Sequence, residues 1–211
     1  IAKHAYVDQH DDLLERILNH PTVIPLYEPE TGGKVGFTTS GNRQDEERLM
    51  RFAERVSSKE REALKDTTKQ KALVGKTLSS EQQAVFEAAT STQNLTLVQG
   101  RAGVGKSYVL GPIREAHAEA GYRVIGLSHT HKLAQDMKRD GFEATTLHGF
   151  LFGLKNGRVS IDTQTLLVVD EGGMLSTPVM LELFHKVQEQ GAKLLLVGDD
   201  DPQGVEFEFL D

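Results

Sequence analysis

One loop constrains this chain more than any other feature, the sequence G-x-x-x-x-G-K-S at Gly100–Ser107. An apolar stretch, Leu95–Gln99, precedes it, and an amphipathic stretch that runs to Ala120 follows it. A strand before and a helix after are the context in which this pattern forms a phosphate-binding P-loop. The glycines let the backbone turn tightly, so that successive N–H groups point at phosphates. The start of the helix adds the positive end of its dipole.

The P-loop also predicts roles for individual residues. Lys106 would reach the β- and γ-phosphates of ATP, and the Ser107 hydroxyl would ligate Mg²⁺. A chance glycine loop is the alternative, which the flanking strand and helix disfavour. The nucleotide-binding residues expected here are Gly100, Ala102, Gly103, Val104, Gly105, Lys106, Ser107 and Tyr108.

From Thr77 onward, apolar runs alternate with amphipathic stretches. Leu166–Val169 and Leu194–Val197 carry no polar alternation, as is typical of strands buried on both faces. This repetition predicts a parallel α/β sheet with helices on both sides, a RecA-like fold class. Strands are expected at 95–99, 123–127, 165–170 and 193–198, and helices at 106–120, 131–140 and 178–190. Gly121 and Gly191 are expected after helix ends, and Thr177 as a helix N-cap.

Two of these strands end in acidic residues. Asp170 and Glu171 follow the strand at 165–170, which we expect to run beside the P-loop strand. Asp170 would then hold Mg²⁺ through Ser107, and Glu171 could polarise the attacking water. Asp199, followed by Gln203, suggests a sensor on the γ-phosphate side, although a simple turn has the same composition.

The segment 1–76 is expected to be a small, mainly helical domain before a lobe at 77–211. Helices are predicted at 11–18 and 44–57, and a short β-hairpin at 23–27 and 34–39. The polar stretch 59–71 reads as a linker helix or a partly disordered segment. Just after it, Ser79 or Ser80 can cap a helix.

The amino-acid composition excludes few classes of protein. The net charge is −7, but six of the acidic residues fall within 199–211, so a local basic groove is compatible with it. Cysteine is absent and no run of eighteen apolar residues occurs, which favours a cytoplasmic protein without a membrane segment. The chain begins with Ile1, so we expect a piece of a longer protein.

The order of these motifs resembles superfamily 1 DNA helicases of the RecD branch, most closely the helicase portion of TraA-type conjugative relaxase-helicases. The family's L-S-x-E-Q motif matches Leu78–Gln82, which implies Gln82 as the adenine reader. Motif I matches the P-loop, and D-E-A-x-M appears as Asp170–Met174. The resemblance implies a cytoplasmic ATP hydrolase that moves on single-stranded DNA, 5′ to 3′, during plasmid transfer.

Two further motifs imply contacts with single-stranded DNA. The family's A-P-T-x-K-A-A resembles the sequence at 127–134, which implies Thr130 and Lys132 on the DNA phosphates. The T-x-H-x-x-L motif matches Thr146–Leu151, which implies His148 and Thr146. Phe150 and Phe152 could stack on bases, but aromatic residues between leucines are more often core. Zinc at His129, His131 and His148 is disfavoured, because structural zinc needs four close ligands.

The chain departs from the family at its end. Motif III of the family is G-D-x-x-Q-L, whereas Gln203 falls one place late and Pro202 takes its position. The second lobe with its arginine fingers and the relaxase domain are expected elsewhere in the parent protein. Since an arginine finger contributes roughly 10³ to 10⁵ in rate, these residues alone should hydrolyse ATP poorly. Alternatives are a degenerate P-loop remnant without turnover and a different P-loop NTPase such as a small-molecule kinase.

Overall fold

The computed structural model describes residues 7–100, 105–172 and 175–199. Packing divides the chain into two units, Ile1–Met50 and Arg51–Asp211. The boundary at residue 77 that composition predicts therefore falls inside the second unit, and residues 51–76 pack with the sheet.

The first unit contains a helix, an antiparallel hairpin and the start of a second helix, namely α1 (Val7–Leu18), β1 (Val23–Tyr27), β2 (Lys34–Thr39) and α2 (Ser40–Ser57). The predicted hairpin is confirmed, with Val23 opposite Thr39. In its connection Gly32 takes a φ of +66°. Both helices begin earlier than predicted, α2 because the Thr39 hydroxyl accepts a hydrogen bond from the Asn42 backbone N–H (3.2 Å) and so caps its first turn.

The second unit is built on a parallel sheet of five strands, in the order β3 (Leu95–Gly100), β7 (Lys193–Asp199), β6 (Thr165–Val169), β4 (Arg123–Ser128) and β5 (Glu143–Thr146). The predicted α/β class is confirmed. The prediction that β6 runs beside the P-loop strand is wrong, because β7 lies between them. Leu195 of β7 pairs with Val168 on one side and Thr96 on the other. Its leucine-rich run is buried, as a central strand requires.

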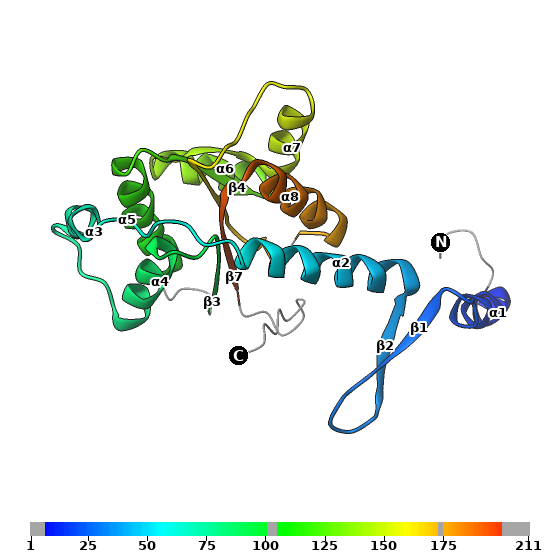
Figure 1. Ribbon diagram of the computed structural model, residues 1–211. Coiled ribbons are helices and arrows are strands. Elements are labelled where there is room, and N and C mark those ends of the chain that lie inside the picture. The colour runs from blue at the N-terminus through cyan, green and yellow to red at the C-terminus, as the bar shows by residue number, and fades with distance from the viewer. Residues whose placement is uncertain (1–6, 101–104, 173–174, 200–211) are drawn as a thin grey trace. The chain divides into compact units, whose positions relative to one another are not determined.

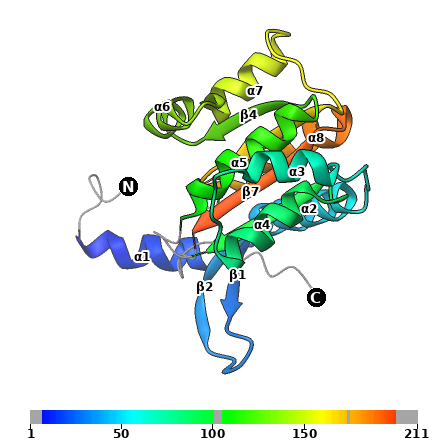
Figure 2. The same ribbon diagram turned by 90° about the vertical axis from the view of Figure 1, so that its left-hand side faces the viewer.

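Helices cover both faces of this sheet, namely α3 (Asp66–Leu73), α4 (Ser80–Thr90), α5 (Lys106–Glu119), α6 (His131–Arg139), α7 (Leu147–Lys155) and α8 (Thr177–Gln190). Figures 1 and 2 show α3, α4 and α5 on one side of β7, with α8 on the other. Phe86 and Ile113 lie in the core beneath the first group, both 0% exposed, beside Val168 of the sheet. Among the described residues, no helix is both long and apolar enough to cross a membrane.

Most element ends agree with the sequence to within a residue, and two local features differ from the prediction. The N-cap of α8 is Ser176, one residue before the predicted Thr177. The pair β5 and α7 was not predicted as a strand and a helix, because the strand is only four residues long and three of the four are polar. Gly191 caps α8 with a φ of +76°, as expected.

The polar stretch after α2 is ordered. Its prediction as a linker helix is confirmed for residues 66–71, which lie in α3, and its prediction as a partly disordered segment is wrong. The part between α2 and α3 is not helical. Its backbone runs extended, and the N–H groups of Arg61 and Leu64 donate to carbonyls just after and at the end of α4. The Arg61 guanidinium donates to the carbonyls of Thr163 (3.0 Å) and Gly191 (2.7 Å). Leu64 is 8% exposed and belongs to the same core as Phe86. This stretch therefore closes the core beneath α3 and α4.

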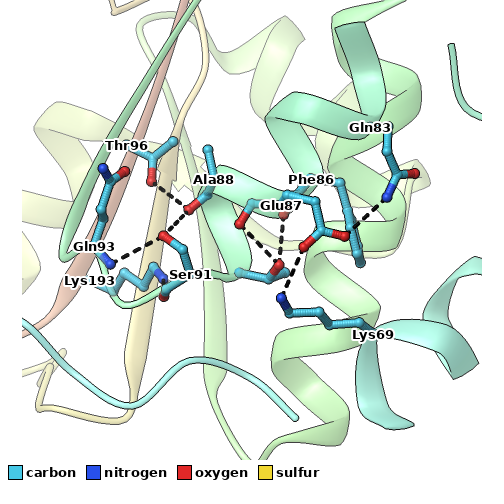
Figure 3. A network of polar contacts seen from close by, with 10 residues as sticks. Lys69, Gln83, Phe86, Glu87, Ala88, Ser91, Gln93, Thr96 and Lys193 are labelled. Carbon is cyan, nitrogen blue, oxygen red and sulfur yellow. Dashed lines mark hydrogen bonds and ion pairs between the residues drawn. The ribbon is translucent and has the colours of Figure 1, made fainter. Parts of the chain in front are cut away.

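A buried lysine, Lys193, lies at the carboxyl end of α4 (Figure 3). Lys193 Nζ donates to the Ser91 carbonyl at 3.0 Å, and the Ser91 hydroxyl donates to the Ala88 carbonyl at 2.7 Å. A cation is stabilised there by the negative end of the helix dipole. Burial nevertheless lowers the pKa of Lys193 to about 8. On the same helix, Glu87 forms an ion pair with Lys69 at 3.0 Å.

Candidate nucleotide and DNA sites at one edge of the sheet

The P-loop lies between the end of β3 at Gly100 and the start of α5 at Lys106. Lys106 Nζ donates to the Gly100 carbonyl, so the lysine side chain folds back across the start of the loop. Gly105 caps α5 in the left-handed conformation, with a φ of +79° that favours glycine. Ser107 and Tyr108 are exposed in the first helical turn. The predicted loop residues Ala102, Gly103 and Val104 lie outside the described residues.

Gln82 meets the other side of the P-loop. It forms a capping box with Ser79, whose side chain accepts from the Gln82 backbone N–H at 3.2 Å. Its Nε2 donates to the Gly105 carbonyl at 3.2 Å, and a Cβ added at Gly105 would lie 2.6 Å from that nitrogen. The predicted adenine reader is thus in contact with the carboxyl end of the loop. Adenine recognition itself stays a prediction.

The acidic pair follows β6 at the same edge of the sheet. The Asp170 N–H donates to the Leu127 carbonyl at 2.9 Å, which ties the end of β6 to β4. Asp170 Oδ1 accepts from the Glu171 N–H at 3.1 Å. Glu171 has a φ of +56°, the only positive value among the described residues that are not glycine. Such a conformation costs free energy and persists only where surrounding contacts hold it.

Candidate oxygen donors for Mg²⁺ follow strands that end at this edge. Register places Asp199 opposite Gly100, so β3, β7 and β6 all end on the side of the P-loop. The Ser107 hydroxyl and the Asp170 carboxylate are hard oxygen donors of the kind Mg²⁺ prefers together with nucleotide phosphates. These donors fit the ion that the P-loop implies. Gln203, the other predicted γ-phosphate contact, lies outside the described residues.

One residue at this site was not assigned a role in it from the sequence. His129 follows β4, and its Nδ1 lies 3.2 Å from Glu171 Oε2. Both side chains are partly buried, at 26% and 35% exposure. The two atoms are within ion-pair distance but not aligned as a hydrogen bond. No local pattern could have signalled this contact, because it depends on β4 and β6 being neighbours in the sheet.

The predicted DNA residues lie at the ends of the two remaining strands. Thr130 caps α6 by accepting from the Leu133 N–H at 3.2 Å, and Lys132 is exposed in the first turn. Thr146 caps α7 in the same way, by accepting from the Gly149 N–H at 3.2 Å, and His148 is exposed beside it. The strands β4 and β5 are neighbours, with Ser128 opposite Thr146. All four candidates therefore reach one edge.

The two phenylalanines of α7 differ in their exposure to solvent. Phe150 is 1% exposed and belongs to the core, whereas Phe152 is 58% exposed. The prediction that Phe150 could stack on bases is therefore wrong, because its ring is buried. The guanidinium of Arg158 lies 5.8 Å from the centroid of the Phe152 ring.

Residues 77–206 match the model of a family described as AAA domain. The chain belongs to this family. It is 34% identical over 210 residues to the conjugal transfer protein TraA of Agrobacterium fabrum, a match that covers 94% of this chain and 19% of that protein. It is 36% identical over 125 residues to the probable conjugal transfer protein TraA of Sinorhizobium fredii, covering 59% and 11%.

A third relative is the multifunctional conjugation protein TraI of Escherichia coli, 30% identical over 134 residues, covering 59% of this chain and 8% of that protein. The chain thus spans about a fifth or less of the length of these relatives. The resemblance to TraA-type conjugal transfer proteins is confirmed by these matches. The family match begins at the residue where the composition of the chain changes.

Proposed function

We propose that this chain is the ATP-binding first motor lobe of a DNA helicase or translocase that acts in conjugative DNA transfer. The observation that carries the proposal is that the parallel strands leading to Lys106, Asp170 and Glu171 end at the same edge of the sheet as the strands leading to α6 and α7. Neighbouring strands thus bear the candidate nucleotide residues and the candidate DNA residues. The names of the relatives, which are conjugal transfer and conjugation proteins, support the proposal that the protein acts in conjugative DNA transfer.

The residues of this edge have separate roles in hydrolysis. Lys106 neutralises the β- and γ-phosphates, and Gln82 orients the adenine. Glu171 accepts a proton from water as the water oxygen attacks the γ-phosphorus, and the bond from that phosphorus to the β–γ bridging oxygen breaks. ADP leaves with the bridging oxygen. Asp199 and Gln203 would read the γ-phosphate side.

Ser107 and Asp170 are the residues that would hold Mg²⁺. When bound, the ion would neutralise the negative charge that develops on the phosphates during hydrolysis. Both donors are oxygens, and Asp170 is held in place by its backbone bond to Leu127 (2.9 Å).

Single-stranded DNA would lie across the starts of α6 and α7. The amino ends of the two helices offer free N–H groups to phosphates, and Lys132 adds a charge. Thr130 and Thr146 would contribute through the helix ends that they cap, and His148 through its exposed ring. A second lobe and a relaxase domain, which we propose as parts of the parent protein in the cytoplasm, would complete the ATP site and supply the DNA to be moved.

Nucleotide binding to this chain tests the proposal directly. A fluorescent ATP analogue with Mg²⁺ should bind the unaltered chain, and Lys106→Ala should weaken binding at least about tenfold, since it removes a charge-assisted contact to phosphate. Lys138→Ala, at an exposed lysine of α6, is the matched control. Equal affinity of all three proteins would overturn the P-loop assignment.

A second experiment separates a motor lobe from a remnant. In the full-length protein, steady-state ATPase should rise with single-stranded DNA and disappear in Glu171→Gln without loss of nucleotide binding. Nucleotide binding without turnover in the full-length protein would instead favour the degenerate remnant. Turnover that phosphorylates a small molecule would favour a different P-loop NTPase.

A further inference from the structure

The contact between His129 and Glu171 joins the two halves of the proposed site. Glu171 is the proposed base for ATP hydrolysis, and His129 precedes Thr130 and Lys132 of the proposed DNA contact. The Nδ1 to Oε2 distance is 3.2 Å. His129 therefore contacts the proposed base of the ATP site and lies next to the proposed DNA contact.

Backbone contacts hold both residues of this pair. The Ser128 hydroxyl donates to the Thr130 carbonyl at 2.9 Å, so the turn that carries His129 is tied to the first residue of the DNA contact. On the other side, Glu171 keeps its φ of +56° while the Asp170 N–H is bonded to β4. A shift of the turn at Thr130 would therefore be transmitted to the imidazole, and from it to the carboxylate.

The contact is not an aligned hydrogen bond, and both side chains are partly solvated. A pair of this kind is weak, so a modest movement separates it. While it is formed, the imidazole competes with water for one oxygen of the proposed base. A coupling between two sites requires a contact that differs between two states, and this pair can supply it.

We propose that His129 is a positioning residue that restrains Glu171 in the absence of DNA, and that single-stranded DNA bound at the Ser128–Lys132 turn releases the carboxylate for hydrolysis. The inference rests on the proposed function, since it needs Glu171 as the base and the turn as a DNA contact. It adds the route by which DNA would stimulate the ATPase.

The test compares ATPase kinetics of the full-length protein with and without oligo-deoxythymidine. In His129→Ala, kcat without DNA should rise about fivefold, the rate effect of losing a weak partly exposed pair. KM for Mg-ATP and the stimulated kcat should stay unchanged, so the stimulation ratio falls by the same factor. His129→Gln retains an N–H donor and should restore the ratio of the unaltered protein.

Two further variants separate a specific role from a structural one. His129→Phe keeps the bulk of the ring without a donor and should behave as His129→Ala. His185→Ala, at an exposed histidine of α8 outside the proposed DNA contact, should leave the ratio unchanged. A fall of kcat in His129→Ala both with and without DNA, or an unchanged ratio, overturns the inference alone. An unaltered protein whose ATPase does not respond to DNA overturns the proposed function as well.

Discussion

Acid should destabilise the second unit through His117, and His117→Phe should remove most of this sensitivity. His117 lies on α5 at 0% exposure, and its Nδ1 donates to the Ile113 carbonyl at 2.8 Å. Among the described residues its Nε2 is buried without a partner, and its ring meets Tyr122 edge-on at 5.3 Å. Burial, with a smaller contribution from the nearby charges of Lys193 and Arg61, lowers the pKa of His117 to about 4.

The size of the effect follows from this pKa. In the unfolded chain the His117 pKa is 6.5, so below that pH the unfolded state takes up a proton that the folded state does not take up until about pH 4. The free energy of unfolding therefore falls as the pH falls through this window. The full shift corresponds to about 3 kcal/mol, of which about 2 kcal/mol is lost by pH 5. Phenylalanine binds no proton in either state.

Urea unfolding followed by far-ultraviolet circular dichroism measures this difference. Between about pH 7.5 and pH 5, the unaltered chain should lose about 2 kcal/mol more than His117→Phe. His148→Gln, at an exposed histidine, should lose as much as the unaltered chain. All titrating groups other than His117 and His148 are common to the three proteins and cancel in the comparison. Equal losses in the unaltered chain and His117→Phe would show that the charge of this buried histidine does not control acid stability.

Three further substitutions test other parts of the structure. Lys193→Met should stabilise the chain by about 1 kcal/mol at pH 7, because burial disfavours the ammonium while one hydrogen bond is lost. The excess in free energy of unfolding of Lys193→Met over the unaltered chain should shrink as the pH rises from about 8 to 10.5, because the folded lysine is neutral in this range. An excess that stays constant with pH in urea unfolding would contradict this. Gly105→Ala places a Cβ 2.6 Å from Gln82 Nε2 at a φ of +79°, so the affinity for a fluorescent ATP analogue should fall at least about tenfold. Unchanged affinity would mean that the loop adapts. Gly126→Ala puts a Cβ 2.6 Å from Met137 Cε, and its thermal midpoint should drop with a loss of about 1–2 kcal/mol; an unchanged midpoint would show that the methionine side chain moves aside freely.

The strands and the P-loop could be predicted because their signals are local. Leu166–Val169 and Leu194–Val197 are uninterrupted apolar runs, and each became a buried strand. The order of the strands could not be predicted in the same way. The insertion of β7 between β3 and β6 depends on pairing between residues far apart in the chain, such as Leu195 with Val168. The short strand at Glu143–Thr146 lacked an apolar run altogether.

The candidate site was predicted as far as its motifs extend. Lys106 donates to the carbonyl of Gly100 and Gln82 to that of Gly105, so the two side chains contact the two ends of the loop. Their roles on a nucleotide stay predictions. The pairing of His129 with Glu171 was out of reach, because each lies in a different motif and the two meet only through the sheet. From the sequence alone, zinc binding by that histidine was considered and disfavoured, and no other role was assigned to it. Side-chain contacts across strands thus carry the information that motifs lack.

The packing of Leu64 and Ala72 into the core of the second unit separates two kinds of boundary. The family that sequence comparison recognises begins at residue 77. The hydrophobic core that includes Phe86 and Ile113 begins earlier, because both residues of the preceding stretch are buried within it. Recombination that transferred residues 77–206 to another protein would carry the P-loop and the acidic pair but not Leu64 and Ala72, and would leave this core open to water. The segment that sequence comparison recognises and the segment that packs as one core therefore do not coincide in this chain.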